Sequence, residues 1–263
     1  MTAPYPFGFI GSGLTRFICL ALPSSRVRAF LHPRLDLSIQ DITAPGTHPV
    51  IFLFQKFSEC QFSFPTALRS MSFHEHTICI PFTSVRADFG PFGGNGPYCF
   101  MPRLYLDDLW VQWNGIFLWG FSKEMAYMEV NESRYAVRSS TGQPLASLTW
   151  VTSVEEAHRP AASCADFEPV RRMLSQKLVS VFPAAMGPCI ALSDFDRRWN
   201  MASVRPLRVD MEIHPTYIPV IEPGRYSTGS NSRLPVSSVP GSWEFLAPWW
   251  LSFPYRFMPP LPQ

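Results

Sequence analysis

Proline is the residue that most limits what this chain can fold into. The 263-residue sequence holds 27 prolines and 15 glycines, spread along its whole length. Proline interrupts helices and the interiors of sheets, and glycine favours turns. We therefore expect many short elements joined by turns, with helices in the minority. The length suits one large domain or two small ones, with enough residues for a substantial core.

The composition indicates a folded, apolar protein. Hydrophobic residues make up 46% of the chain and charged residues only 16%, whereas charged residues form about a quarter of an average chain. The net charge of +2 comes without any cluster of Lys and Arg, which argues against a nucleic-acid partner. The 22 Phe, 8 Trp and 8 Tyr suit either a deep pocket for an apolar ligand or simply an aromatic-rich β core.

The cysteines and the apolar runs bear on where the protein resides. The six cysteines are scattered through apolar runs without a CxxC pair, so we expect buried, reduced thiols. No apolar run approaches the length of about 18 residues that a transmembrane helix needs. The start "MTAPYPFGFIGSG" lacks the basic and apolar regions of a signal peptide. We therefore expect a cytoplasmic protein without a membrane partner.

Runs of β-branched and aromatic residues predict a chain built mainly of strands. The predicted strands lie at residues 14–23, 48–57, 73–85, 98–106, 109–115, 116–121, 135–140, 146–154, 188–215 and 241–257. Asn114-Gly115 and Thr141-Gly142 are expected to form turns between strands.

Two segments have helical patterns, and three others read as loops. A short helix is expected from Ser24 or Ser25, as N-cap, to near Pro33. A longer helix is predicted over Asp166–Phe182, where apolar residues fall on one face. Residues 1–13 are expected to be loose, 89–97 ("FGPFGGNGP") to form a wide turn, and 222–241 an exposed loop. The order predicts an α+β fold around a curved antiparallel sheet or barrel.

Three groups of residues are candidates for chemistry. His74 and His76 share one face of a predicted strand and can bind a metal together, or simply lie half exposed. Asp107-Asp108 is either an acid/base pair or part of a turn. Lys123 follows the apolar run "LWGFS". A lysine in an apolar pocket loses its proton readily and attacks carbonyl groups, whereas one at a strand end extends into water.

The segment around Lys123 resembles a known family. "YLDDLWVQWNGIFLWGFSKEMA" begins at Tyr105 and is similar to the acetoacetate decarboxylase signature, without a gap between Tyr105 and Lys123. Upstream, "TRFICLALPSSRVRAFLHPRLDL", "HPVIFLFQKF" and "PFTSV" resemble the first strands and helix of that family. The resemblance covers residues 14–151. It implies a single domain over residues 1–263, with the sheet closing into a cone-like β-barrel flanked by a few helices.

The resemblance also implies a role for Lys123. In the family, the first lysine of a pair forms a Schiff base with a β-keto acid, and the iminium acts as an electron sink for the loss of carbon dioxide. Lys123 matches that lysine, but Glu124 replaces the second one and Ser84 stands where the family has a strand glutamate. The other family glutamate falls near Phe54 or Gln55. The matched positions are therefore less polar than in the family, which favours a larger hydrophobic carbonyl compound as substrate.

These observations predict a tailoring enzyme of secondary metabolism, a lyase or cyclase. Lys123 would act as Schiff-base nucleophile or as a donor that polarises a carbonyl, in a cyclisation, dehydration, isomerisation or pericyclic step. The residues expected to bind substrate lie on either side of Lys123 and on one upstream strand: Ser84, Arg103, Tyr105, Gln112, Trp113, Trp119, Phe121 and Glu124.

Two alternatives remain open at this point. One is a β-keto acid decarboxylase in which another cation, such as Arg103, replaces the second lysine. The other is a non-catalytic protein that binds a small molecule. In every case the resemblance implies neither a metal nor an organic cofactor, and it allows a homo-oligomer.

Overall fold

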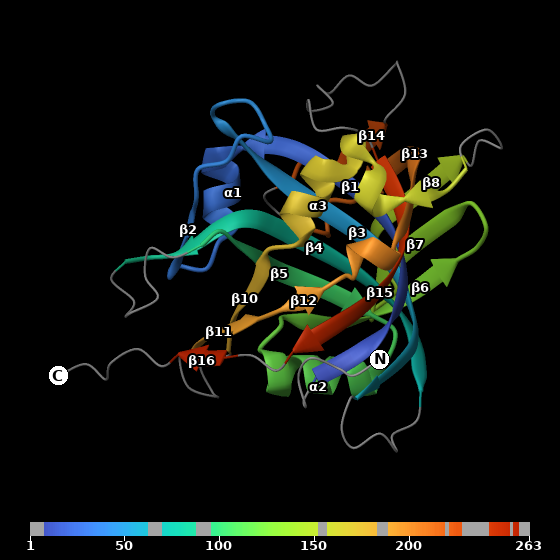
Figure 1. Ribbon diagram of the computed structural model, residues 1–263, viewed down its shortest axis with the longest axis horizontal. Helices are drawn as coiled ribbons and strands as arrows, with labels where there is room; N and C mark the ends of the chain where they lie inside the picture. The colour runs from blue at the N-terminus through green and yellow to red at the C-terminus, as the bar shows by residue number, and fades with distance from the viewer. Residues whose placement is uncertain are drawn as a thin grey trace.

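The computed structural model describes residues 8–62, 70–87, 96–151, 157–182, 189–218, 221–227, 242–252 and 255–257. Strands dominate the described part of the chain; among the short helices, α1 and α2 lie toward the periphery and α3 lies over the long strands (Figure 1). The prediction of a mainly β protein with few helices is therefore confirmed. The helices described here are all too short to cross a membrane.

The strands have the following bounds: β1 Gly8–Pro23, β2 Leu35–Leu37, β3 Thr47–Phe62, β4 Met71–Val85, β5 Tyr98–Leu106, β6 Lys123–Val130, β7 Arg134–Ser139, β8 Pro144–Val151, β9 Arg159–Pro160, β10 Lys177–Val181, β11 Ile190–Ser193, β12 Phe195–Asp196, β13 Ser203–Ile213, β14 Gly224–Ser227, β15 Ser242–Ser252 and β16 Tyr255–Phe257. The α-helices are α1 Ser24–Phe30, α2 Leu109–Trp119 and α3 Glu168–Leu174, and the short 3-10 turns are η1 Ala161–Ser163, η2 Ala165–Phe167 and η4 Trp199–Met201.

The strand pairings close on themselves. The order β5-β6-β7-β8-β13-β15-β1-β3-β4 is a path of hydrogen-bonded neighbours, and β4 pairs back onto β5. Most of these pairs are antiparallel, whereas β5 runs parallel to both β6 and β10. Figure 1 shows the long strands β1, β3 and β4 curving together across the molecule. The predicted curved sheet is thus present, while its description as a cone-like barrel stays a prediction.

The connection from β5 to β6 corrects the sequence-based prediction of two strands over residues 109–121. This segment forms helix α2, because a parallel pair of neighbouring strands needs a crossover connection. The Asp108 carboxylate caps the helix by accepting a hydrogen bond of 2.9 Å from the Val111 amide. Gly120 ends it with a φ of +70°, in the left-handed region that favours glycine. Asn114-Gly115 therefore lies inside a helix and forms no hairpin.

The helix predicted over residues 166–182 is also shorter than expected. α3 ends at Leu174, and residues 177–181 form β10 between β5 and β11. The apolar face was placed correctly up to that point, since Val170, Met173 and Leu174 are buried. Beyond it, pairing with two neighbouring strands outweighs the local helical pattern.

Some of the other local predictions are confirmed and others are wrong. α1 confirms the short helix that follows the first strand, but Pro23 precedes it and no side chain caps it. Gly142 has a φ of +82° in the turn between β7 and β8, which confirms the second hairpin. Residues 8–13 belong to β1 and residues 224–227 to β14, where loose segments were expected. Residues 1–7, 88–95 and 228–241 lie outside the described part, and with them most of the predicted wide turn and exposed loop.

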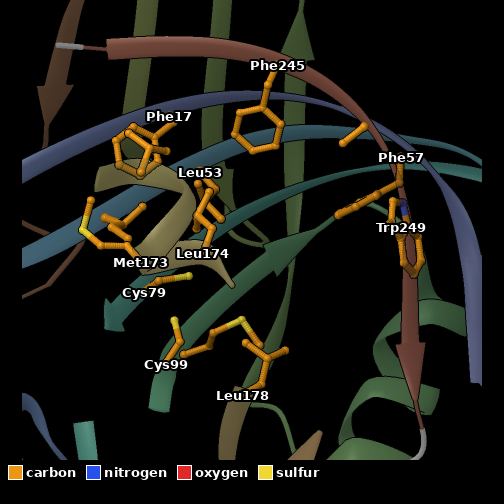
Figure 2. Packing of buried hydrophobic residues seen from close by; sticks show 14 of the residues in the cluster. Phe17, Leu53, Phe57, Cys79, Cys99, Met173, Leu174, Leu178, Phe245 and Trp249 are labelled. Carbon is orange, nitrogen blue, oxygen red and sulfur yellow. The ribbon is translucent and has the colours of Figure 1, made fainter. Parts of the chain in front are cut away.

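The central strands bury both of their faces. Along β3, Ile51 and Leu53 pack into one hydrophobic cluster, whereas Phe52 and Phe54 pack into another. This alternation follows from the two-residue period of a strand. Figure 2 shows part of the first cluster, in which α3 covers the sheet. All six cysteines are buried and free, as predicted.

Candidate active site

Lys123 and Glu75 form a buried ion pair on the face of the sheet that carries the first cluster. The Lys123 Nζ lies 2.8 Å from the Glu75 Oε2, and the two side chains are only 7% and 8% exposed. Lys123 opens β6 beside Leu104 of β5, and Glu75 lies on β4 on the other side of β5. The lysine side chain therefore extends across one strand to reach its partner.

A glycine of α2 makes room for this lysine. A Cβ at Gly115 would overlap the Cε and Cδ of Lys123 and lie 3.1 Å from its Nζ. Glycine costs about 1 kcal/mol relative to alanine inside a helix, and the close approach of the lysine explains its presence here. From the preceding turn, Gln112 Nε2 donates a hydrogen bond of 3.2 Å to the Lys123 carbonyl. The helix thus fixes both the backbone and the side chain of Lys123.

Glu75 continues into a row of polar side chains on adjacent strands. The Thr77 hydroxyl lies 3.0 Å from the Glu75 Oε1 and 3.3 Å from the Gln55 Oε1, so its single proton can be donated to either. Gln55 Nε2 in turn donates to the Thr15 hydroxyl at 3.2 Å. These contacts orient the carboxylate toward Lys123.

The ion pair borders a cavity with mainly apolar walls. The cavity volume is about 70 Å³, several times the 10–15 Å³ or so that one water molecule needs by the same kind of measure. That space accommodates a small organic molecule, and a larger one requires side chains to move. The lining residues come from the sheet, from α2 and from the segment after β11, and the polar or charged ones are Gln55, Glu75, Thr77, Asn114, Lys123 and Arg197.

Arg197 is the second cation that lines this cavity. It follows β12, is 6% exposed and donates a hydrogen bond of 2.6 Å from Nη1 to the Leu174 carbonyl. Its guanidinium carbon lies 4.2 Å from the centre of the Phe195 ring. Burial lowers the pKa of Arg197 to about 10, with nearby Cys79 and Glu75 acting in the opposite direction. The group therefore remains charged at neutral pH.

Three of the residues predicted to bind substrate lie at or beside the site. Trp119 and Phe121 line the cavity together with Lys123. The Trp119 indole donates to the Ser252 carbonyl at 2.9 Å, which holds its ring in place. Gln112 does not line the cavity, and it contributes through the Lys123 backbone instead.

Two other predicted residues lie away from the cavity. The Ser84 hydroxyl donates to the Asp36 carbonyl at 3.4 Å, near the far end of β4. Trp113 is 57% exposed on the outer side of α2, with its ring 5.0 Å from that of Phe117. The prediction for Trp113 assumed a strand, and the helix turns this residue outward.

Arg103, Tyr105 and Glu124 were also predicted to contact substrate and do not line the cavity. Arg103 and Tyr105 flank Leu104 in β5, and Glu124 follows Lys123 in β6, so all three face the opposite side of the sheet. Arg103 and Glu124 pair with each other there, each more than 40% exposed. Glu124 therefore points away from Lys123, because successive residues of a strand face opposite sides of the sheet.

Glu75 is the residue that sequence reasoning missed. It stands between the two histidines considered as metal ligands, and strand alternation places it on the cavity face with Thr77. His74 and His76 share the other face, as predicted, but each has a protein partner: Asp107 at 2.9 Å for His74, and Tyr217 for His76. No cluster of metal-ligating side chains is present among the described residues.

Comparison with known proteins identifies the fold. No family model matches the sequence and no curated protein matches it. Among solved structures, the enduracididine biosynthesis enzyme MppR is similar with a TM-score of 0.63 and 15% identity, over 98% of this chain and 89% of MppR. Acetoacetate decarboxylase from Legionella pneumophila has a TM-score of 0.62 and 14% identity, over 100% of this chain and 94% of that one. An acetoacetate decarboxylase-like enzyme from Sphingomonas wittichii has a TM-score of 0.61 and 12% identity, over 96% and 94%.

The protein thus has the acetoacetate decarboxylase-like fold, as the resemblance of its sequence to that family predicted. MppR has also been solved in complex with pyruvate, and with the condensation product of pyruvate and imidazole 4-carboxaldehyde.

Proposed function

We propose that this protein is an enzyme that acts on a small carbonyl compound through Lys123. The observation that carries the proposal is the contact of 2.8 Å between Lys123 and Glu75 at an apolar cavity. Water solvates the ammonium group of a lysine enclosed in this way only poorly. The amine is nevertheless well placed to react with a carbonyl group in the cavity. Glu75 supplies an acceptor for the proton that the amine must lose before it attacks.

The proposed first step is the formation of a Schiff base. Glu75 takes a proton from the Lys123 ammonium group, and the amine adds to the substrate carbonyl to give a carbinolamine. Return of that proton to the departing hydroxyl releases water and leaves a protonated imine, so charge and atoms balance. The imine withdraws electrons from the adjacent carbon, where Glu75 is placed to remove or deliver a proton.

Dehydration, cyclisation or isomerisation fits this arrangement better than the decarboxylation of a β-keto acid. Each of these steps needs a base beside the imine, which Glu75 provides. The similarity to MppR, an enzyme of enduracididine biosynthesis, supports a tailoring role in secondary metabolism. The β-keto acid decarboxylase alternative loses the cation it was expected to use, since Arg103 pairs with Glu124 on the other face.

Covalent trapping tests the proposal. The protein is incubated with pyruvate or with 2-butanone in the presence of borohydride, which reduces an imine to a stable amine. The lysines of the chain are Lys56, Lys123 and Lys177, so peptide mass spectrometry assigns the adduct without ambiguity. We expect the adduct on Lys123, its loss in Lys123→Ala, and no change in the control Lys56→Ala, whose side chain is exposed.

The alternatives give different results. If Lys123 only donates a hydrogen bond to the carbonyl, no adduct forms with either compound. A non-catalytic binding protein shows thermal stabilisation by the carbonyl compound without an adduct. Either result contradicts the Schiff-base proposal.

A further inference from the structure

A second pocket lies where α3 leads into β10 and where β12 pairs with β15. Its volume of about 260 Å³ is more than three times that of the cavity beside Lys123, which is about 70 Å³. Phe195 and Arg197 line both the pocket and the cavity, whereas Lys123 and Glu75 line the cavity alone. The pocket is therefore a second place at which a small molecule can bind, and the proposed function makes no use of it.

Three buried side chains that line this pocket have hydrogen-bond donors without acceptors in the described part of the chain. The indole N–H of Trp250, a residue only 2% exposed, has no partner there. Gln176 accepts a hydrogen bond of 2.8 Å from the Phe82 N–H, which occupies its amide oxygen and leaves its amide nitrogen. Arg197 donates to the Leu174 carbonyl, which uses one of its five N–H groups. Buried donors without acceptors are costly, so a ligand that supplies acceptors would stabilise the pocket.

The same pocket also holds an acceptor that lacks a donor. The carboxylate of Asp194 makes no hydrogen bond to any described residue. Its charged neighbour, the Lys177 Nζ, is 3.6 Å away, beyond the usual range of about 2.7–3.2 Å. Asp196 differs, because its carboxylate accepts a hydrogen bond from the Arg198 amide and pairs with the Arg198 guanidinium, both at 2.9 Å. The pocket thus offers buried donors together with one carboxylate, at a side chain that is 35% exposed.

We propose that this pocket binds an α-amino acid in its zwitterionic form. The carboxylate of the ligand accepts hydrogen bonds from Arg197, Trp250 and Gln176, and its ammonium group donates to Asp194. A guanidinium matches a carboxylate with two parallel hydrogen bonds, and hydrogen bonds between ionised groups are the stronger ones. A ligand with a single charge would leave either the buried donors or Asp194 without a partner. The two ends of an amino acid satisfy both at once.

The walls of the pocket indicate which side chain the amino acid carries. The aromatic rings of Phe195 and Trp199 line the pocket. The Trp199 indole donates a hydrogen bond of 2.8 Å to the Ser175 hydroxyl, so its polar group is already satisfied. Aromatic surfaces of this kind bury apolar groups favourably. An amino acid with an apolar side chain, such as leucine, therefore fits the pocket best.

Matched ligands test the proposal on the unmodified protein. The affinity of L-leucine is compared by calorimetry with that of 4-methylpentanoate, which lacks the ammonium group, and with that of 3-methylbutylamine, which lacks the carboxylate. We expect L-leucine to bind at least tenfold more tightly than either compound, because each lost charge-assisted hydrogen bond weakens binding. Equal or tighter binding of one of the singly charged compounds overturns the proposal, and so does a lack of L-leucine binding.

Variants then assign the binding to this pocket. Trp250→Phe keeps the aromatic ring and removes the N–H, and Asp194→Asn removes the negative charge. We expect each to lower L-leucine affinity about tenfold, and Asp194→Asn to remove the advantage over 4-methylpentanoate. The matched controls are Trp113→Phe on the exposed side of α2 and Asp166→Asn, at a side chain that is 75% exposed; both should bind L-leucine as the wild type does. Unchanged affinity in folded Trp250→Phe and Asp194→Asn proteins contradicts the inference.

The inference and the proposed function fail separately, because an amino acid such as leucine offers no ketone or aldehyde to Lys123. If L-leucine binds as expected but no carbonyl compound forms an adduct on Lys123, the amino-acid site stands and the Schiff-base function is wrong. If adducts form on Lys123 and L-leucine does not bind, the function stands and the amino-acid site is wrong.

Discussion

The molecule contains two buried clusters of charge that are built in different ways. In the first, Arg16, Glu244 and Arg205 stand directly opposite one another on β1, β15 and β13. Glu244 lies between the two arginines, 3.0 Å from Arg16 and in contact with Arg205. Arg16 also stacks 3.6 Å above the Trp150 ring. Opposite charges at paired positions stabilise one register of the strands, because a slip of one residue separates them.

In the second cluster, Lys123 and Glu75 are not on neighbouring strands. They are separated by β5 and meet only because the lysine side chain extends beside Gly115 toward Glu75. Their contact borders a cavity, and a third charge, Arg197, lacks a carboxylate among the described residues. Burial alone therefore does not mark a reactive pair. What distinguishes the cavity pair is open space beside it and the absence of a register role.

The largest expected effect on stability lies in the register cluster. Glu244→Gln leaves two arginines facing each other around a side chain that is 3% exposed. Breaking a buried ion pair costs about 3–5 kcal/mol, so we expect a loss of that size in the free energy of unfolding. Urea titration measures it, with Glu222→Gln as control. Glu222 is 64% exposed in its pair with Arg26, and that change should cost less than about 1 kcal/mol.

Glu75→Gln should destabilise the protein less and impair its chemistry more. A glutamine still accepts a hydrogen bond from Lys123, and the adjoining cavity has room for water to solvate the ammonium group. We expect a loss of about 1–3 kcal/mol in urea titration. Borohydride trapping on Lys123 should slow by about a hundredfold, the usual contribution of a positioned base. A loss of stability equal to that in Glu244→Gln, with trapping intact, would remove the distinction between the clusters.

The sequence predicted the pieces of the sheet better than it predicted the site. Strand runs such as residues 73–85 are recognisable because β-branched and aromatic residues agree with the local pattern. The segment at 109–119 was predicted wrongly because its apolar residues suit a helix as well as a strand. The decisive signal was the helix cap at Asp108 and not the Asn114-Gly115 pair.

The candidate site depends on contacts between residues far apart in the sequence, and these contacts limit how much of it could be predicted from the sequence. Lys123 was found from its local apolar context and from the family resemblance, both of which a sequence contains. Glu75 and Arg197 join it from 48 and 74 residues away, through the order of β4, β5 and β6 and the path of the chain after β12. Strand alternation could have placed Glu75 with Thr77, but nothing local to Arg197 indicated the cavity.

His76 provides a pH-dependent reference on the face of β4 opposite Glu75. Burial lowers the pKa of His76 to about 3 from 6.5, so the unfolded chain binds a proton between these values and the folded protein does not. Stability from this group is therefore complete above pH 6.5 and falls as the pH decreases toward 3, by about 1.4 kcal/mol per pH unit. His76→Gln should flatten the pH dependence of unfolding by that slope between pH 6 and 5. An unchanged slope would show that acid sensitivity arises in the charge clusters instead.

Gly115→Ala tests whether the reactivity of Lys123 depends on the position of its side chain beside Glu75. Alanine favours the helix by about 1 kcal/mol, and the overlap of its Cβ with Lys123 opposes that gain. The overlap displaces the lysine from Glu75, and loss of that buried contact outweighs the helix gain, so we expect a net loss of up to about 2 kcal/mol in the free energy of unfolding. We expect trapping to slow by at least tenfold. Trp113→Ala, on the exposed side of the same helix, serves as a control that keeps the wild-type rate.

The smallest effect is expected at Glu124, where the resemblance to acetoacetate decarboxylases predicts a second lysine. Glu124 faces away from the cavity and pairs with Arg103, both side chains being more than 40% exposed. Exposed pairs contribute about 0–1 kcal/mol, so Glu124→Gln should change stability by less than that and leave trapping on Lys123 unaltered. A lysine introduced at this position, Glu124→Lys, should for the same reason confer no new reactivity. If either variant changes the trapping rate severalfold, the exposed face of β6 contributes to the chemistry, and a buried cavity pair is not sufficient to define the site.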